Sequence, residues 1–217
     1  SFRDNRLRLN LVYHLYFENL EKIMKSVVLL GSVLLLSACG SMQSQVVKKN
    51  VSFDPGIQAQ IRSYGSYGSD LIRIYPETDC TKWEGTKRNA VNRRFVNGLP
   101  RKVRNISIGI PPTELSRKTE KDTGFVFRAS YREMVVSANQ PVVLDGAFSS
   151  QMRNHHYSCR VAASFTPKVG EAYEVRYLSE EEGCDIEVYH IGHEEKDGVH
   201  QTKKLTANYC AKPGTSF

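Results

Sequence analysis

From residue 124 onward, hydrophobic and polar residues alternate in short stretches that are rich in Val, Ile, Tyr and Phe. Alternation with a period of two places the apolar side chains on one face of a strand, and β-branched and aromatic residues favour strands. Turn-forming Asn, Pro and Gly residues separate many of the stretches. The pattern predicts strands at 125–131, 133–137, 142–148, 157–165, 172–178 and 185–191.

The rest of the chain adds a few elements to this β pattern. Further strands are expected at 71–75, 103–110 and 199–205. Residues 57–61 fit either a short helix or a strand, whereas the glycine- and serine-rich stretch 64–69 predicts a loop. Residues 113–123 are charged and lack an apolar face, so a second loop is predicted there. Strands at this spacing, without helical periods between them, predict a mainly β fold: a single antiparallel β-sandwich of the immunoglobulin or transthyretin type.

The amino-terminal part has a different pattern, a single apolar run. Lys25 precedes this run at 27–36, which only a Gly–Ser pair interrupts, and small residues follow it. A basic residue, a short apolar run and small residues before a cleavage point are typical of a secretory signal. The run is also shorter than the roughly 20 residues that a membrane-spanning helix needs. We therefore expect a cleaved signal peptide here and no element of the fold.

The residues Leu36-Ser37-Ala38-Cys39 end this run. They resemble the lipobox of bacterial lipoproteins, in which a leucine and two small residues precede a modified cysteine. The resemblance implies lipid attachment to the Cys39 sulfur, cleavage after Ala38 and acylation of the new amino terminus, with the bilayer as partner. Two or more acyl chains make anchoring stable. Gly40, where an aspartate would favour the inner membrane, resembles the pattern of outer-membrane lipoproteins that face the periplasm. An ordinary signal peptide followed by a chance cysteine is the alternative.

These features divide the chain into four parts. Residues 1–23 lie upstream of Met24 and are interpreted as translated upstream or non-native sequence, with a genuine cytoplasmic extension as the alternative. Residues 24–38 are the predicted signal peptide. Residues 39–52 are the predicted lipidated tether, because most of this stretch is polar and it has no periodicity. Residues 53–217 are then the β-sandwich, a common size for one domain.

The chain has five cysteines. If lipid attachment occupies Cys39, an even number remains, and in an oxidising compartment this implies two disulfides. The sequence alone leaves three pairings open. We favour Cys159 with Cys184, because this pair brackets one hairpin-like unit. Cys80 would then pair with Cys210 and connect the start of the domain to its end. A metal site is the weaker interpretation, because the C-x-x-C spacing is missing.

The formal net charge is +7, which bears on solubility and surface association more than on fold. Exported proteins meet little nucleic acid, so lipid headgroups and anionic polysaccharide are the first acidic partners to consider. Cations gather in one segment, and the candidates for contact with an anionic surface are Lys87, Arg88, Arg93, Arg94, Arg101, Lys102 and Arg104. Each such charge contributes about 1 kcal/mol near anionic lipid before screening. A solvated strand edge, which charge also protects, is the alternative.

Other chemistry-bearing residues give weaker signals. His190, His193 and His200 are close in sequence, but histidines three apart on a strand face different ways, and a polar hairpin is preferred to a metal site. Glu133 and Asp145 are single carboxylates without an evident partner. The sequence has no nucleophile elbow, phosphate-binding glycine loop or dinucleotide fingerprint. We therefore predict no enzyme activity, no metal and no cofactor.

A second resemblance concerns the domain itself. It is carried by Ile108-Gly109-Ile110-Pro111, Glu133, 135–141, Cys159, Phe165-Thr166-Pro167, Gly170, Tyr173 and Cys184. In this order the residues look like those of small β-sandwich envelope lipoproteins of unknown function, in which a segment F-x-P-x-x-G-x-x-Y precedes a cysteine. The resemblance covers roughly residues 100–192, and it implies an architecture but no active site.

Together these features predict a membrane-anchored envelope lipoprotein, a non-enzymatic binding or assembly component that contacts an envelope protein or an anionic polysaccharide. One alternative is an inhibitor or immunity lipoprotein whose loop plugs the cleft of an envelope-targeting hydrolase. Another is an envelope hydrolase itself. Four aromatic residues are expected to pack in the core or at its rim more readily than to form a binding face: Tyr64, Tyr67, Tyr75 and Trp83.

Overall fold

The computed structural model describes residues 46–65, 71–86, 89–91, 95–96, 99–100, 104–122, 128–152, 155–180 and 183–211. The predicted upstream segment, the signal peptide and Cys39 lie outside these residues. All the described residues belong to one compact unit, Met42–Phe217. In this described part of the chain, no helix has the length and apolar character needed to span a bilayer.

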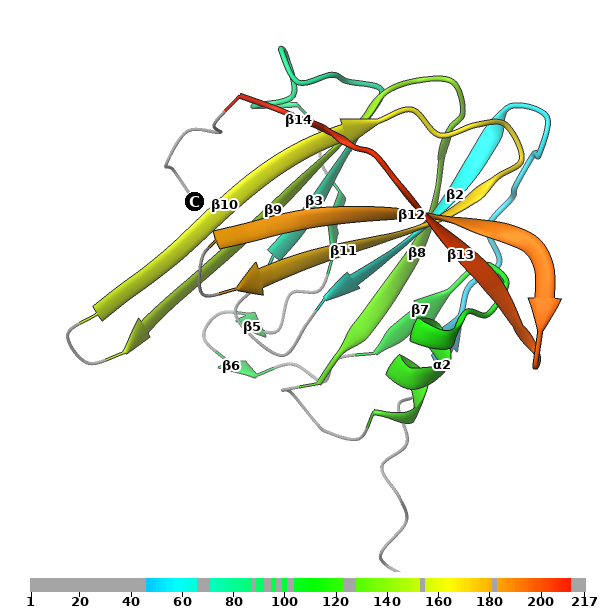
Figure 1. Cartoon of the computed structure of the whole chain (residues 1–217), viewed down its shortest axis with the longest axis horizontal. Helices are drawn as coiled ribbons and strands as arrows, with labels where there is room; N and C mark the ends of the chain where they lie inside the picture. Colours follow the sequence, from blue (N-terminus) through cyan, green and yellow to red (C-terminus); the bar gives the residue numbers. More distant parts are fainter. Residues whose placement is uncertain are drawn as a thin grey trace, which may run out of the picture. The chain divides into compact units, whose positions relative to one another are not determined.

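Two sheets make up most of the unit (Figure 1). The larger sheet has the strand order β1 (Val46–Lys48), β7 (Asn105–Ser107), β8 (Ser130–Ser137), β2 (Gln58–Gly65), β11 (Ala172–Glu180), β12 (Gly183–Lys196) and β13 (Val199–Leu205). The smaller sheet has the order β14 (Asn208–Tyr209), β10 (His155–Phe165), β9 (Val142–Met152), β3 (Leu71–Pro76) and β4 (Asn89–Val91). A separate pair consists of β5 (Phe95–Val96) and β6 (Leu99–Pro100), and α2, the one helix among the described residues, spans Glu114–Lys121.

The two sheets pack against each other around a hydrophobic core. Ile61 and Val175 reach this core from the larger sheet, and both are fully buried. Ile74 and Leu144 reach it from the smaller sheet and are equally buried. Burying one such side chain contributes about 1.5–3 kcal/mol. The alternation along each strand therefore supplies the apolar layer that holds the sandwich together.

Gly146 in β9 allows the two sheets to approach closely. A Cβ atom at this position would lie 2.2 Å from a ring carbon of Tyr177 in the facing sheet. The Tyr177 hydroxyl donates to the Cys159 carbonyl oxygen at 3.1 Å, which fixes the ring in place. A larger residue at position 146 would have to displace this ring, so the close approach requires glycine.

The mainly β sandwich with two disulfides is confirmed. Most strand pairings are antiparallel. The pairings of β1 with β7, of β7 with β8 and of β2 with β11 are parallel, which an antiparallel sandwich does not include. Alternation along one strand reveals its two faces but not the direction of its neighbours. A parallel pair needs a long crossover, and the chain between β2 and β11 provides one.

The prediction of a loop at 113–123 is wrong, because this segment contains helix α2. The Thr113 side chain accepts a hydrogen bond from the Ser116 N–H, and the Ser116 hydroxyl accepts one from the Thr113 N–H. This reciprocal capping box satisfies the first turn of the helix. The residues that α2 buries are Ser116 and Thr119. The helix therefore packs through small polar side chains and lacks the apolar stripe that identifies most helices in a sequence.

Several boundaries also differ from the expected ones, and three of the differences change the organisation of the chain. β1 brings Val46–Lys48 into the sheet, so the folded part begins within the stretch 39–52 that was assigned to the tether. β2 runs on into the predicted loop at 64–69. Of the predicted strand 103–110, the described residues 104–110 include only the short β7, and Gly109, two residues after its end, adopts a φ of +102°.

Candidate functional site

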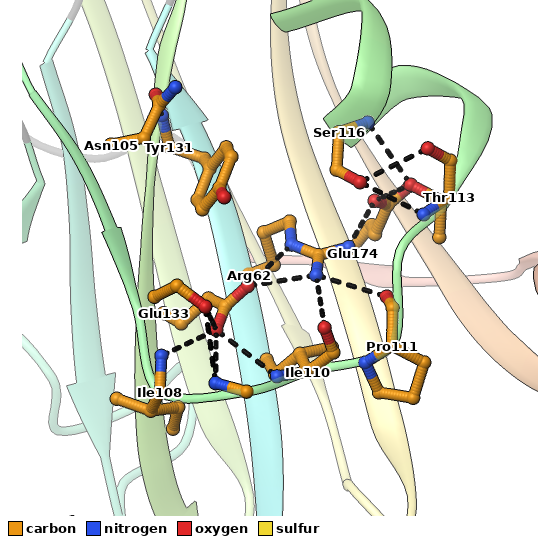
Figure 2. Close-up of polar contacts among 12 residues, drawn as sticks. Arg62, Asn105, Ile108, Ile110, Pro111, Thr113, Ser116, Tyr131, Glu133 and Glu174 are labelled. Carbon is orange, nitrogen blue, oxygen red and sulfur yellow. Dashed lines mark hydrogen bonds and ion pairs between the residues drawn. The ribbon is translucent and has the colours of Figure 1, made fainter. Parts of the chain in front are cut away.

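A row of charged residues crosses the outer face of the larger sheet, on the side away from the core. The strand register places Arg62 of β2 opposite Glu133 of β8 on one side and Glu174 of β11 on the other. The Arg62 side chain is 2% exposed, and both carboxylates are fully buried. Figure 2 shows the guanidinium lying between the two carboxylates. One buried cation is therefore paired with two buried anions.

The Arg62 guanidinium connects three strands and the segment that covers them. Its Nε donates to Glu133 Oε1 at 2.9 Å, and its Nη1 donates to Glu174 Oε1 at 3.1 Å. Its Nη2 donates to the backbone carbonyl oxygens of Ile110 and Pro111, at 2.8 and 3.0 Å. Charge-assisted bonds of this kind are about twice as strong as neutral ones. Removing one partner of a buried pair costs about 3–5 kcal/mol, so this contact network strongly constrains the site.

Glu133 is held by a loop that wraps around its carboxylate. The successive backbone N–H groups of Ile108, Gly109 and Ile110 donate to its Oε2 at 2.6, 3.1 and 3.2 Å. The Ser107 hydroxyl donates to the same oxygen at 2.9 Å. Successive N–H groups that point at one place form an anion-binding nest. Here the protein's own carboxylate fills the nest and fixes the loop over the sheet, as Figure 2 shows.

Glu174 lies at the other end of the row, beneath the start of α2. Its Oε1 accepts hydrogen bonds from Arg62, from the Tyr64 hydroxyl and from the Thr113 hydroxyl. Its Oε2 is buried and has no hydrogen-bond partner among the described residues; Arg176 Nη2 lies 3.9 Å away. The Nε of Arg176 is likewise buried without such a partner in this part of the chain. An unsatisfied buried polar group costs about 1–3 kcal/mol, so this end of the row is incomplete.

The surroundings of this row of charged residues determine the protonation states of Tyr64 and Arg62. Burial and the negative charge of Glu174 raise the pKa of Tyr64 above its usual range, so the hydroxyl stays neutral and donates. Burial by itself would lower the pKa of Arg62, but Tyr64 (once its hydroxyl ionises) and the two carboxylates outweigh it and raise that pKa. At neutral pH the guanidinium is therefore a fixed positive charge between two acceptors.

A cleft of about 280 Å³ lies beside Glu174, between α2 and β13. Its lining includes Leu115 and Lys118 of α2, Glu174 and Arg176 of β11, and residues 199–202 of β13. The His200 N–H donates to the Pro112 carbonyl oxygen at 2.8 Å and so holds β13 against the segment that precedes α2. The volume is near the lower limit of ligand pockets. The cleft is therefore suited to a small molecule with polar groups.

A second buried ionic cluster lies in the smaller sheet and has the opposite composition. Asp145 in β9 accepts hydrogen bonds from Arg73 Nη1 at 2.8 Å and from Arg160 Nε and Nη2 at 2.9 and 3.1 Å. The Arg160 guanidinium also lies 5.4 Å from the centroid of the buried Trp83 ring. Glu133 and Asp145, which have no evident partner in the sequence, are both paired in the structure. Arg62 is 71 residues from Glu133 and Arg73 is 72 residues from Asp145, whereas Arg160 lies 15 residues from Asp145 on the next strand.

The described cysteines form two disulfides. Cys80 pairs with Cys210 across 130 residues, and Cys159 pairs with Cys184 across 25, the pairing that the sequence analysis favours. In the loop-entropy model these bonds stabilise the fold by about 5 and about 3.5 kcal/mol. The second bond joins β10 to β12 and therefore connects the two sheets directly. The first holds the carboxyl-terminal end of the described chain beside Trp83, because Cys210 packs against that cluster.

Most residues predicted to contact an anionic surface lie outside the described part of the chain: Lys87, Arg88, Arg93, Arg94, Arg101 and Lys102. Arg104 is described; it is exposed and directly precedes β7. Of the aromatic residues, Tyr64, Tyr75 and Trp83 are buried and pack in the interior, as expected. Tyr67 lies outside the described residues.

Two of the three histidines approach the same carboxylate, that of Glu171, and His200 has other partners. His190 Nε2 pairs with Glu171, and His200 Nδ1 lies 2.9 Å from the Gly192 carbonyl oxygen. His193 is exposed, and its Nε2 lies 3.8 Å from Glu171. Within the described residues, no three or more His, Cys, Asp or Glu side chains are grouped as a metal site would require.

Sequence reasoning missed the central residues of the site, namely Arg62, Thr113 and Glu174. Of these three, only Glu174 has a signal in the sequence. It lies between the core residues Tyr173 and Val175 on one strand, and this places its side chain on the face away from the core. The sequence predicts that such a position is exposed to solvent, because it does not show that another segment covers this face of the sheet. Comparison of the chain with family models, with curated proteins and with solved structures gives no match.

Proposed function

We propose that this chain is a bacterial envelope lipoprotein, acylated at Cys39 and held on the outer membrane, facing the periplasm. The observation that supports this proposal most strongly is that the four other cysteines pair with one another. Disulfides persist in oxidising compartments such as the periplasm. The pairing leaves the cysteine at the end of Leu36-Ser37-Ala38-Cys39 for the lipid.

The sandwich itself is proposed to be a non-enzymatic binding or assembly component. The buried charges support this role, because Arg62 and Glu133 are bonded to each other and to the backbone around them. Asp145 is equally engaged by Arg73 and Arg160. Groups that are held in this way stabilise the architecture, whereas catalysis needs a free nucleophile or base beside the substrate.

The tether in this proposal is short. β1 begins at Val46, and seven residue steps from Cys39 cover at most about 25 Å when fully extended. β1 pairs in parallel with β7, and the exposed Arg104 directly precedes β7. We propose that this end of the larger sheet faces the anionic headgroups, with Arg104 among the contacting cations and Arg101 and Lys102 next to it in the sequence.

Lipid attachment is tested by growing bacteria that express the full chain with a radioactive fatty acid. We expect label on the protein and recovery of the protein with the outer membrane. Cys39→Ser loses the label because the acceptor sulfur is gone. The matched control is the double variant Cys159→Ser and Cys184→Ser, which removes the two cysteines of one disulfide and keeps the label. A wild-type product that carries no fatty acid and retains residues 24–38 would overturn the proposal.

A second candidate function is an inhibitor of an envelope-degrading hydrolase. The feature that favours it is the long β9–β10 hairpin, which extends beyond the neighbouring strands (Figure 1). Tyr157 on this hairpin is 64% exposed, and tyrosine is a common anchor of protein interfaces. Calorimetry of the full chain with a muramidase, an amidase and a lipase tests this candidate. One-to-one binding that Tyr157→Ala weakens about tenfold supports it, and no binding to any of the three contradicts it.

A further inference from the structure

Two residues that line the cleft between α2 and β13 each have a buried polar atom whose hydrogen bond is not made. Glu174 Oε2 is an acceptor and Arg176 Nε is a donor, both residues line the cleft, and neither atom has a partner within the described structure. Native structures rarely leave such groups unsatisfied without a bound water, ion or ligand. Because the two atoms are of complementary kinds, they point to a molecule that both donates and accepts.

The buried row fixes the position of the acceptor. Three hydrogen bonds hold Glu174 Oε1, so the carboxylate cannot turn to satisfy its second oxygen. Arg176 follows two residues later on β11 and lies on the same face of the sheet, because side chains alternate along a strand. Its side chain is 27% exposed, and its guanidinium carbon lies 4.2 Å from the centroid of the Tyr189 ring. We expect Arg176 to shift across this ring when a ligand reaches Glu174.

The charges around the cleft disfavour a simple ion. An inorganic anion would meet the Glu174 and Glu114 carboxylates, and a metal cation would meet Lys118 and Arg176. Each kind of ion would therefore be repelled by two of the four charged residues that line the cleft and attracted by the other two, so neither kind gains a net attraction from them. A neutral ligand with many hydrogen-bonding groups avoids both repulsions.

The remaining lining residues also suit a neutral polar ligand. Leu115 and Val199 are the apolar contributors, whereas His200, Gln201 and Thr202 add donors and acceptors along β13. Ligand pockets for apolar molecules are lined mainly by hydrophobic and aromatic side chains, and this lining differs from them. The ligand should therefore carry several hydroxyl or amide groups on a compact frame.

We propose that the cleft binds one unit of a saccharide, with a single hydroxyl bridging Glu174 Oε2 and Arg176 Nε. A hydroxyl has one donor and two acceptor lone pairs, so one oxygen satisfies both buried atoms. A neighbouring hydroxyl on the same ring would reach Thr202 on β13. This inference deepens the proposed function by naming the ligand class, and it rests on that proposal only for the source of the sugar, the glycans of the envelope.

The test is a titration of the nitrogen-15-labelled full chain in a detergent without a sugar headgroup. The probes are N-acetylglucosamine, glucose and a tetrasaccharide of N-acetylglucosamine. We expect saturable shifts of the backbone amide signals of Leu115, Arg176 and Gln201. Tighter binding of the tetrasaccharide assigns the cleft to a glycan chain, and equal binding of the free sugar assigns it to a soluble saccharide.

Substitutions of residues that line the cleft test whether the sugar binds there. Arg176→Met removes the bridging donor and should weaken binding about tenfold. Thr202→Val is nearly isosteric, removes one hydroxyl and should weaken binding about threefold, and it serves as the second variant if the first does not fold. Lys203→Gln is the matched control on the same strand, because Lys203 does not line the cleft, and its affinity should be unchanged.

Two results would overturn the inference. One is the absence of any saturable shift with all three sugars, and the other is equal binding by the wild type, Arg176→Met and Thr202→Val. Neither result bears on fatty acid at Cys39, which is measured independently. Loss of the lipid with sugar binding intact would in turn remove the proposed location and leave the saccharide site in place.

Discussion

The two buried ionic clusters of the sandwich are built in opposite ways. In the larger sheet, Arg62 is one cation between two carboxylates, and it is covered by a loop and by α2. In the smaller sheet, Asp145 is one anion between Arg73 and Arg160, whose side chains are 7% and 11% exposed. Both oxygens of Asp145 are hydrogen-bonded. The first cluster ends in an unsatisfied oxygen of Glu174.

This difference separates an architectural cluster from one that also serves a site. The Asp145 carboxylate has both oxygens bonded and holds β3, β9 and β10 together. Arg73 Nε in this cluster is buried without a partner among the described residues, but Arg73 does not line the cleft. The Arg62 cluster holds its strands equally well and in addition presents Glu174 to the cleft. A buried group without its hydrogen bond is destabilising. A protein that keeps such a group beside a cleft retains binding capacity there at the expense of stability.

The largest effect is expected from breaking the Arg62 cluster. Arg62→Met leaves Glu133 and Glu174 buried without their cation, and we expect the free energy of unfolding to fall by about 3–5 kcal/mol. Urea unfolding at neutral pH, followed by Trp83 fluorescence, measures the change. The matched control is Arg117→Met, because Arg117 is 54% exposed and its surface pair contributes at most about 1 kcal/mol. Equal losses in the two variants would contradict the assignment.

A smaller effect is expected in the other cluster. Asp145→Asn removes the anion but keeps one acceptor oxygen, and Arg160 retains some contact with water. We therefore expect a loss of about 2 kcal/mol in the same urea experiment, together with a change in Trp83 fluorescence, because Arg160 stacks on that ring. If Asp145→Asn lowers the free energy of unfolding as much as Arg62→Met does, the predicted difference between the two clusters is contradicted.

The smallest effect concerns the pH dependence of stability. The folded protein raises the pKa of Tyr64 above its unfolded value of about 10. Above that pH the unfolded chain loses the proton first, so the free energy of unfolding falls as pH rises, by up to about 1.4 kcal/mol per pH unit.

Tyr64→Phe removes this term, and its stability should fall less steeply with pH than that of the wild type. Urea unfolding between about pH 9 and 11 gives the two slopes. Burial also raises the pKa of Tyr131, together with its bond to Glu120, so a residual slope is expected in the variant. Identical slopes in both proteins would show that Tyr64 does not keep its proton in the folded state.

The strands were predictable because their signal is local. Apolar residues such as Val142 and Leu144 alternate with polar residues or form short runs, as is typical of buried strands. Turn-forming residues mark the ends of many of these stretches. The disulfides were also predictable, since counting cysteines and setting Cys39 aside leaves few arrangements. Helix α2 was not, because it buries Ser116 and Thr119 in place of an apolar stripe.

The candidate site was beyond sequence reasoning for a related physical reason. Arg62 is separated by 71 residues from Glu133 and by 112 from Glu174, so only strand register brings them together. Each occupies an outward-facing position of its strand, which in isolation indicates exposure to water. These charges are buried because the nest-forming loop and α2 lie above them. The sequence features of the loop and the helix are Gly109 and the Thr113–Ser116 capping box. These features are short, and they do not reveal which residues the loop and the helix cover.

The most direct test of this account is a crystal structure of the protein grown with N-acetylglucosamine. It predicts a sugar in the cleft with one hydroxyl oxygen about 3 Å from both Glu174 Oε2 and Arg176 Nε, and an unchanged row of Glu133, Arg62 and Glu174. Ordered waters that satisfy both atoms at saturating sugar, or a sugar bound elsewhere on the molecule, would contradict it.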